Sequence, residues 1–380
     1  MSVEALVICF WGLEDVAAGE VAELLGEKRF RVVGRGRVVF ECSPEEFLTL
    51  NLGCRALLRV LVYGGACRVS LGKEGLDEVY RAVREFEWCE LFDESFTFAV
   101  RTARHGGHSY TSIDVNRVAG QAVVDYFNGR IKVDLRNPDV VVRCYVIDDL
   151  FYFGVDTSGA SLHKRGYRVY NHPAPLNPVL ASCMLRLSRW RCGRSLLDPM
   201  CGSGTILIEA GMMALGIPPG SFRRSYPLVR LKPFSGLDVG EELARLRERM
   251  SKGRCSPELY GVDVSPKHIQ GAVLNAARAG VHTIDFTVGD FLEVYGRYSV
   301  DYMVSNPPFG YRSGRRGRIA ELYRRLSAAL VECVHEGVCV ISEAGVAGVF
   351  EEELGKHMEL AERRVVPYGG LQTKILYFKP

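Results

Sequence analysis

The chain has 380 residues, a length that usually forms two or three domains because one hydrophobic core rarely sustains it. Its composition, 47% apolar and 24% charged, is that of an ordinary soluble globular protein. The formal net charge is only +3, so the field of the whole molecule is too weak to indicate a nucleic-acid partner, and any basic surface must be local.

No window approaches about eighteen uninterrupted apolar residues, which argues against a membrane span. Glu4, Glu14 and Asp15 bracket a short apolar run at the start, unlike a signal peptide, so we expect a cytoplasmic protein. The twelve cysteines form no Cys-x-x-Cys pair and lack the spacing of zinc sites and redox motifs. We therefore expect no metal and mostly buried cysteines, and the sequence leaves disulfides open.

Residues 1–65 predict a small α+β domain. A strand over 3–10 is followed by a helix whose apolar positions share one face before Gly26. A β-ribbon spans 31–41, and Ser43-Pro44-Glu45-Glu46 has the capping-box pattern of a helix start. With a strand over 57–62, this alternation predicts a ferredoxin-like domain.

Residues 66–158 predict a second α+β domain. Helices are expected over 74–86 and 112–127 with a strand over 96–101 between them. An alternating run over 140–147 turns at Asp148-Asp149 into 150–155, which predicts a half-buried hairpin. The segment 96–159, including Asn137-Pro138-Asp139-Val140, resembles the THUMP domain of RNA-modifying enzymes, which implies RNA binding.

Residues 159–178 are rich in Gly, Pro, His and basic residues and form the best candidate for a linker. Two interpretations stay open, namely a solvated connector and a segment that contacts RNA phosphates. For the second interpretation the candidate RNA-binding residues are Lys164, Arg165 and Arg168.

Residues 179–380 predict a doubly wound α/β domain. The stretch 195–206 is a strand, an Asp-Pro, a loop with two glycines and a helix start. Glycine permits positive φ and close approach of a ligand to the backbone, and a helix start offers free N–H groups. Further strands end at Asp263, Val288 and Ser305, an insertion spans 217–256, and an antiparallel hairpin over 358–378 closes the sheet.

The glycine loop, the acidic strand end at Asp263 and the run Asn306-Pro307-Pro308-Phe309 together resemble the class I methyltransferases that use S-adenosylmethionine. Asn-Pro-Pro-aromatic is the family's signature for methylating a planar exocyclic nitrogen. The loop departs from Gly-x-Gly-x-x-Gly, which argues against a nicotinamide enzyme.

The resemblance implies roles for individual residues. Asp198 would receive the cofactor's ammonium, Asp263 the ribose hydroxyls and Asp290 the adenine amino group, with Val264 or Phe291 packing on the ring. Asn306 and the Pro307 carbonyl would accept the two amine hydrogens, and Phe309 would stack on a flipped base. The predicted catalytic residues are Asn306, Pro307 and Phe309, and the predicted cofactor-binding residues are Asp198, Met200, Cys201, Gly202, Ser203, Gly204, Thr205, Asp263, Val264, Asp290, Phe291 and Asn306.

A basic run follows the Asn-Pro-Pro-Phe motif. Arg312, Arg315, Arg316 and Arg318 are interleaved with glycine, serine and tyrosine. A charge run is usually a solvated face, but the place of this one beside the predicted catalytic loop favours contact with polynucleotide phosphates.

Over nearly its whole length the chain resembles the archaeal and bacterial THUMP-containing guanine-N2 RNA methyltransferases. The branch that modifies guanosine 6 in the tRNA acceptor stem is the nearest in pattern. Other branches act on guanosine 10 of tRNA, where Asp typically replaces Asn306, or on large-subunit ribosomal RNA. A DNA adenine-N6 or protein glutamine methyltransferase and a non-catalytic RNA-binding protein are the alternatives from other classes.

From this resemblance we expect S-adenosylmethionine as cofactor and tRNA as partner, bound at its acceptor stem and 3′ end. THUMP domains of related enzymes recognise that single-stranded end. We also expect a monomer with neither membrane nor metal partners.

Overall fold

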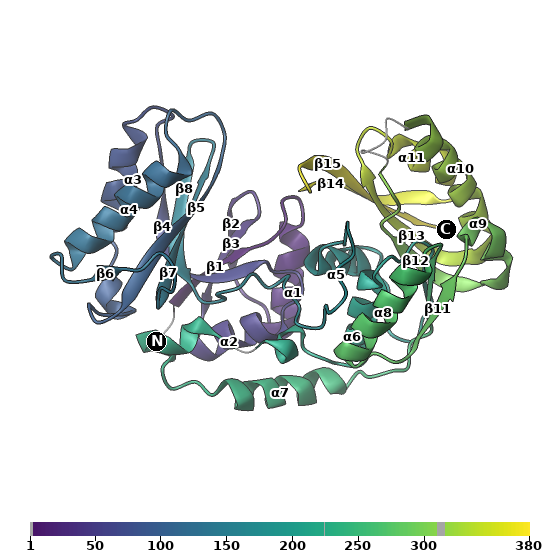
Figure 1. Ribbon diagram of the computed structural model, residues 1–380, viewed down its shortest axis with the longest axis horizontal. Coiled ribbons are helices and arrows are strands. Elements are labelled where there is room, and N and C mark those ends of the chain that lie inside the picture. Colours follow the sequence, from purple (N-terminus) through teal and green to yellow (C-terminus); the bar gives the residue numbers. More distant parts are fainter. Residues whose placement is uncertain (1–2, 224, 310–315) are drawn as a thin grey trace.

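The computed structural model describes residues 3–223, 225–309 and 316–380. Its N-terminal half, residues 3–158, contains an eight-stranded sheet in the order β2-β3-β1-β4-β8-β7-β5-β6, drawn in purple and blue in Figure 1. Helices α1 and α2 belong to its ferredoxin-like part, and α3 and α4 to its THUMP-like part. The bounds are β1 (Val3–Ile8), α1 (Glu14–Leu25), β2 (Phe30–Gly34), β3 (Arg37–Cys42), α2 (Pro44–Gly53), β4 (Arg59–Arg68), α3 (Gly75–Arg84), η1 (Trp88–Glu90), β5 (Thr97–His105), α4 (Ser112–Tyr126), β6 (Lys132–Val133), β7 (Val140–Ile147) and β8 (Leu150–Asp156).

Helix α2 begins where the capping-box pattern predicts. The Glu46 N–H donates to Ser43 Oγ at 3.3 Å, and the Ser43 N–H donates to Glu46 Oε2 at 2.8 Å. Pro44 occupies the first helical position, where its missing N–H has no intrahelical partner to lose.

Strand β4 joins the two predicted N-terminal domains into one sheet. It pairs with β1 on one side and with β8 on the other, so the predicted boundary at 65/66 falls inside a strand. The sequence indicated a strand over 57–62 only, because a register shift lies between Tyr63 and Gly65, where Gly65 has φ +143°. A bulge breaks the alternation that signals a strand, and here it hid the second part of β4.

The C-terminal half, residues 179–380, is the predicted doubly wound fold. Its sheet has the order β11-β10-β9-β12-β13-β15-β14, with parallel pairing from β11 to β13 and an antiparallel β14–β15 hairpin at the edge (Figure 1). The bounds are α5 (Pro178–Leu187), β9 (Leu196–Asp198), α6 (Thr205–Ala214), η2 (Pro219–Phe222), η3 (Pro227–Arg230), η4 (Lys232–Phe234), α7 (Val239–Ser251), β10 (Leu259–Asp263), α8 (Pro266–Ala279), β11 (Ile284–Val288), α9 (Phe291–Val294), η5 (Tyr295–Arg297), β12 (Val300–Ser305), α10 (Arg316–Cys333), β13 (Val334–Glu343), α11 (Gly348–Leu354), β14 (Glu359–Tyr368) and β15 (Leu371–Lys379).

The two halves share one hydrophobic core. A single cluster of buried residues includes Val7 and Phe153 from the N-terminal sheet and Leu180 and Leu196 from the C-terminal half. The predicted linker contributes Leu162 and Leu176 to the same cluster. Part of the linker is therefore packed into the body of the protein, which argues against a fully solvated connector, while Lys164 and residues 173–175 are exposed.

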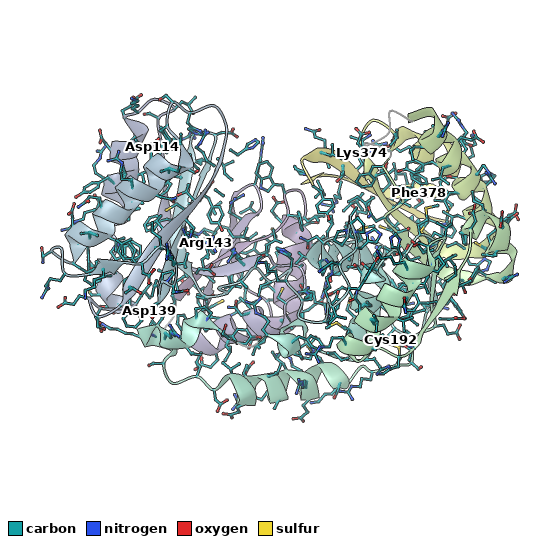
Figure 2. All side chains as sticks on the ribbon, in the orientation of Figure 1. Asp114, Asp139, Arg143, Cys192, Lys374 and Phe378 are labelled. Atoms are coloured by element: carbon teal, nitrogen blue, oxygen red, sulfur yellow. A yellow bond between two sulfur atoms is a disulfide. The ribbon has the colours of Figure 1, made fainter. Side chains whose placement is uncertain are left out.

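The insertion between α6 and β10 runs back beneath the N-terminal half. Helix α7 lies along the lower edge of Figure 1 and contacts α2, where Thr49 Oγ1 donates to Glu242 Oε1 at 2.5 Å. At the end of the insertion Cys255 forms a disulfide with Cys192, whose Cα lies 5.9 Å away (Figure 2). This bond fastens the end of the insertion to the loop that precedes β9.

Replacing both Cys192 and Cys255 with serine is expected to lower the free energy of unfolding by about 2–4 kcal/mol. The bond closes a loop with a sequence separation of 63, and without it the unfolded chain gains conformational freedom. Urea unfolding of the oxidised protein measures the change, with Cys89→Ser, at an exposed free cysteine, as control. Equal midpoints for the oxidised wild type and the double variant would contradict this expectation.

Candidate active site

The glycine loop connects the end of β9 to the start of α6. Gly202 has φ +52° and Gly204 has φ +76°, conformations that residues with a Cβ rarely adopt. A Cβ on Gly204 would also lie 3.1 Å from Ala272 Cβ and from the Phe286 ring. Both glycines are thus required by the turn, as the sequence predicts, and Gly204 is required by packing as well.

The other loop residues are held tightly against the sheet. The Cys201 N–H donates to the Val262 carbonyl at 2.9 Å, and both Cys201 and Ser203 are buried. Burial raises the pKa of the Cys201 thiol well above its ordinary value, so this cysteine is a neutral packing residue. Met200 is half-buried.

Asp198 lies at the end of β9, next to the end of β12. Its side chain accepts hydrogen bonds from Ser305 Oγ at 2.7 Å and from the Met200 N–H at 3.3 Å. Asp198 is only 2% exposed, and this burial raises its pKa to about 7 despite the two hydrogen bonds. The pair Asp198–Ser305 therefore couples the glycine loop directly to the residue before Asn306.

Asp263, at the end of β10, holds the glycine loop from the other side. Its Oδ2 accepts from the Gly202 N–H at 2.9 Å, and its Oδ1 accepts from the Ser265 N–H at 2.9 Å. Each carboxylate oxygen retains a further acceptor position. The carboxyl ends of β9, β10 and β12 thus bring Asp198, Asp263 and Asn306 to one edge of the sheet.

Asn306 carries a side-chain acceptor in the loop that follows β12. Its side-chain oxygen is buried and, within the described part of the chain, forms no hydrogen bond. Pro307 is buried and Phe309 half-buried, while Tyr323 Oη donates to the Pro308 carbonyl at 3.0 Å and holds the loop in place. A buried, unsatisfied amide oxygen costs about 1–3 kcal/mol, which is a reason to expect a ligand donor there.

The predicted linker forms a wall beside this site. The Asn275 side-chain oxygen accepts from the N–H groups of Val169 and Tyr170, both at 2.9 Å, and Arg168 donates to Thr205 Oγ1 at 2.7 Å. The sequence did not single out Asn275 because an amide within a helix carries no signal for a partner about a hundred residues away.

Two histidines also border the glycine loop and were not predicted. The rings of His172 and His268 lie 4.2 Å apart, and His268 Nδ1 is 3.4 Å from Asp263 Oδ1. The His172 ring is 3.5 Å from where a Cβ of Gly202 would lie. Burial and the neighbouring His268 lower the pKa of His172. No sequence spacing relates these histidines, since one lies in the linker and the other in the first turn of α8.

The three residues proposed to contact the adenine have different environments in the structure. Asp290 accepts from the Leu292 N–H at 3.0 Å and caps α9. Val264, next to Asp263, is 68% exposed and free to pack on a ligand. The Phe291 ring is buried in a core cluster against Tyr298, so its predicted ring-packing role was wrong. The Phe291 side chain packs in this core cluster, and it therefore cannot also line a pocket for a ligand.

The predicted RNA-binding residues also differ in exposure. Lys164 and Arg318 are exposed, as phosphate contact requires. Arg165 is buried in an ion pair with Glu209, with 3.2 Å between Nε and Oε1, so its prediction was wrong, and Arg168 is occupied by Thr205. Arg312 and Arg315 lie outside the described residues, and Arg316 is placed only as the first residue of α10.

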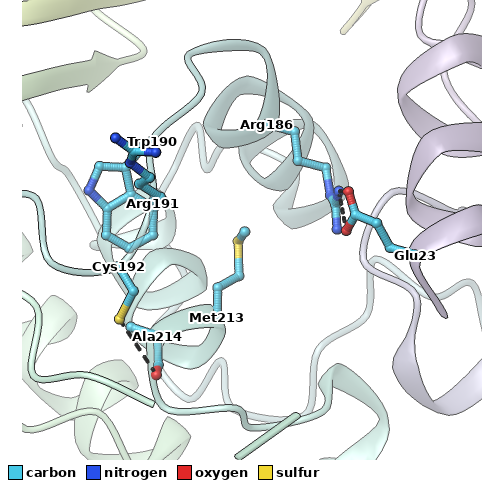
Figure 3. Close-up of a pocket in the computed structure, with 7 residues that line it drawn as sticks. All are labelled: Glu23, Arg186, Trp190, Arg191, Cys192, Met213 and Ala214. Carbon is cyan, nitrogen blue, oxygen red and sulfur yellow. Dashed lines mark hydrogen bonds and ion pairs between the residues drawn. The ribbon is translucent and has the colours of Figure 1, made fainter. Parts of the chain in front are cut away.

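A cavity of about 350 Å³ lies elsewhere, between α1, α5 and α6 (Figure 3). In the described part of the chain its lining contains none of the predicted site residues and consists of Glu23, Arg186, Trp190, Arg191, Cys192, Met213 and Ala214. Among the described residues, no cluster of three metal-ligating side chains occurs, and every helix is too short or too polar to cross a membrane.

Three family models match consecutive parts of the chain. The RMKL-like methyltransferase domain family matches residues 165–374, the THUMP domain family residues 73–156, and the RlmL ferredoxin-like domain family residues 4–61. A tRNA (guanine(6)-N2)-methyltransferase of Archaeoglobus fulgidus is 39% identical over 99% of this chain and 93% of its own length.

Two further proteins extend the comparison. A ribosomal RNA large subunit methyltransferase K/L of Shewanella frigidimarina is 34% identical over 76% of this chain, which spans 41% of that longer protein. The crystal structure of a possible methylase from Clostridium difficile superposes with a TM-score of 0.83 at 25% identity, covering 100% of this chain and 99% of that one.

Proposed function

The chain belongs to the family of RMKL-like methyltransferases that carry a THUMP domain, and from this premise we propose that it methylates the exocyclic N2 of a tRNA guanosine, using S-adenosylmethionine. We further propose guanosine 6 of the acceptor stem as its target, which the Archaeoglobus relative's name supports. The observation that carries the proposal is the buried side-chain oxygen of Asn306, which has no hydrogen-bond partner among the described residues and directly follows Ser305, the donor to Asp198.

The residues around the glycine loop fit this cofactor. Asp198 offers a carboxylate for an ammonium group, and Asp263 keeps acceptor positions for two hydroxyls. The positive φ angles of Gly202 and Gly204 let the backbone turn tightly between Asp198 and the start of α6. Val264 provides an exposed apolar side chain for a ring, and the His172 ring lies next to Gly202.

S-adenosylmethionine would supply an electrophilic methyl group with a neutral thioether as its leaving group. The protein must prepare the acceptor, because the lone pair of a guanine amine is delocalised into the ring. The Asn306 side-chain oxygen and the Pro307 carbonyl accept the two amine hydrogens and direct the lone pair toward the methyl group. Phe309 offers a face for the flipped base, and most of the rate then comes from orientation.

An assay of the purified protein with three nucleic acids tests the proposal. Transcribed tRNA, large-subunit ribosomal RNA and double-stranded DNA are incubated with S-adenosylmethionine labelled in its methyl group, and digests are analysed by mass spectrometry. We expect N2-methylguanosine in the acceptor stem of tRNA. Methylation of ribosomal RNA alone would instead support the activity named for the Shewanella relative, and methyladenosine in DNA would refute the proposal.

Cofactor affinity is expected to depend on pH through Asp198. Its pKa is about 7 in the folded protein against an ordinary value of 3.8, so between those values the folded chain holds a proton that the unfolded chain has released. Stability of the cofactor-free protein therefore falls as pH rises through this window. Binding an ammonium requires the ionised carboxylate, so cofactor affinity should rise by up to about tenfold per pH unit below 7 and level off above it.

Calorimetry with S-adenosylhomocysteine between pH 5.5 and 8 measures this dependence. Asp198→Asn should bind weakly at every pH and lose the slope, whereas Asp285→Asn, at an exposed position in β11, should keep the wild-type profile. A slope that survives in Asp198→Asn would assign the titration to another group.

A further inference from the structure

Arg55 reaches from the N-terminal half into the C-terminal half. It lies in the loop between α2 and β4 and is only 2% exposed. Its guanidinium donates to the Met212 carbonyl at 3.3 Å and to the Ile217 carbonyl, and one nitrogen lies 3.5 Å from Glu209 Oε2. Met212 is in the last turn of α6, where the helix dipole favours a cation, and its carbonyl also accepts from the Ile217 N–H at 2.9 Å. Arg55 thus caps a helix of the other half.

Glu209 is the fully buried centre of this contact. Its carboxylate accepts from Arg165 Nε at 3.2 Å, from Tyr167 Oη at 3.0 Å and from Ser182 Oγ at 3.0 Å, in addition to its ion pair with Arg55. Burial alone would raise the pKa of Glu209, but Arg165 and Arg55 outweigh it and hold that pKa below its usual range. The carboxylate is therefore ionised, and it joins the N-terminal half, the linker and two helices of the C-terminal half.

The backbone of the Arg55 loop is held as well. Glu20 Oε2, on α1, accepts from the N–H groups of Arg55 at 2.9 Å and Ala56 at 2.6 Å. The other Glu20 oxygen pairs with Arg186 of α5 at 3.1 Å. Figure 3 shows Arg186 pointing from α5 toward Glu23 of α1, an ion pair of 2.8 Å on the same boundary. The loop is therefore fixed from both halves.

Helix α6 connects this cluster to the candidate active site. It begins at Thr205 directly after the glycine loop, carries Glu209 about one turn later and ends against Arg55. A ten-residue helix is a rod of about 15 Å. Helix α6 therefore sets the distance between the Arg55 loop of the N-terminal half and the glycine loop that we assign to the cofactor.

We propose that Arg55 and Glu209 are positioning residues that fix the RNA-binding half relative to the catalytic pocket, and that they thereby determine which guanosine is methylated. The inference rests on the proposed function. Buried ion pairs often add little net stability compared with apolar residues of the same size, whereas their directional hydrogen bonds define one geometry. A role in specificity accounts for keeping the buried charges of Arg55, Arg165 and Glu209 at this boundary.

Arg55→Met tests the proposal without leaving an unpaired carboxylate, because Glu209 keeps Arg165, Tyr167 and Ser182. Each protein is assayed well below its own unfolding temperature for S-adenosylhomocysteine affinity, for kcat/KM with tRNA, and for the positions of methyl groups by mass spectrometry. We expect affinity within twofold of the wild type, kcat/KM at least tenfold lower, and methyl groups at guanosines next to the wild-type position. Arg55→Lys should restore part of the single-site pattern.

Arg364→Met is the matched control. Arg364 of β14 pairs with Asp15 at 2.9 Å across the same two halves, but Asp15 is largely exposed, so its removal should leave both rate and position unchanged. The proposal is overturned if Arg55→Met methylates one position at the wild-type rate, or if it loses activity together with cofactor affinity. Failure of the wild type to methylate tRNA would count against the proposed function instead, and the position test would then use the RNA that the wild type does methylate.

Discussion

Asn306→Ala is expected to lower the rate of methyl transfer by on the order of 10²–10³-fold while cofactor affinity stays within a few-fold. The magnitude is that observed when one preorganised polar group is removed from an active site. In the structure the Asn306 oxygen is buried and, among the described residues, unpaired, and Tyr323 fixes the following loop through the Pro308 carbonyl. Alanine removes the acceptor and leaves that support intact.

Single-turnover methylation of tRNA and calorimetry with S-adenosylhomocysteine measure the two quantities separately. Asn306→Asp is the informative companion variant, because it retains an oxygen acceptor at the same position, and it should keep much more activity than alanine. If Asn306→Ala transfers methyl groups within a few-fold of the wild-type rate, the mechanism proposed for the Asn-Pro-Pro-Phe loop is wrong.

Removal of the 3′ CCA from tRNA is expected to reduce kcat/KM by about 100-fold or more, since each lost base stack is worth about 1–3 kcal/mol. In the proposed mechanism Asn306 and Phe309 would hold any flipped guanine, so we expect selection to come from where the rest of the protein holds the RNA. The shared sheet strand β4 and the common core place the THUMP-like part at a set distance from the pocket. If the THUMP-like part binds the 3′ end as proposed, we expect the methylated guanosine to lie in the acceptor stem, at a set distance from that end.

Two RNA substrates separate this effect from a general loss of contacts. A minihelix with the acceptor stem and an intact CCA end should be methylated at the same guanosine as full-length tRNA, although it lacks most of the molecule. Full-length tRNA without CCA should be a poor substrate. Efficient methylation of the trimmed tRNA would show that binding of the 3′ end does not determine which guanosine is methylated.

Local sequence determined many of the turns, caps and strand ends of this protein. The glycine loop after β9, the acidic end of β10, the capping box at Ser43 and the closing hairpin each depend on residues within at most twenty positions of one another. Such features follow from backbone propensity, capping and turn chemistry, which act over short range. The doubly wound order then follows because alternating strands and helices pack in few ways, and this brings Asp198, Asp263 and Asn306 to one edge.

Burial and long-range pairing were decided only by the tertiary structure. Arg165 is a basic residue in a basic segment, yet it is buried because it forms an ion pair with Glu209. Phe291 packs in the core rather than at the candidate site. His172 meets His268 because the linker folds back over the glycine loop. In each case the local pattern was compatible with two environments, and the choice depended on a partner far away in sequence, whose contact exists only when the whole chain is packed.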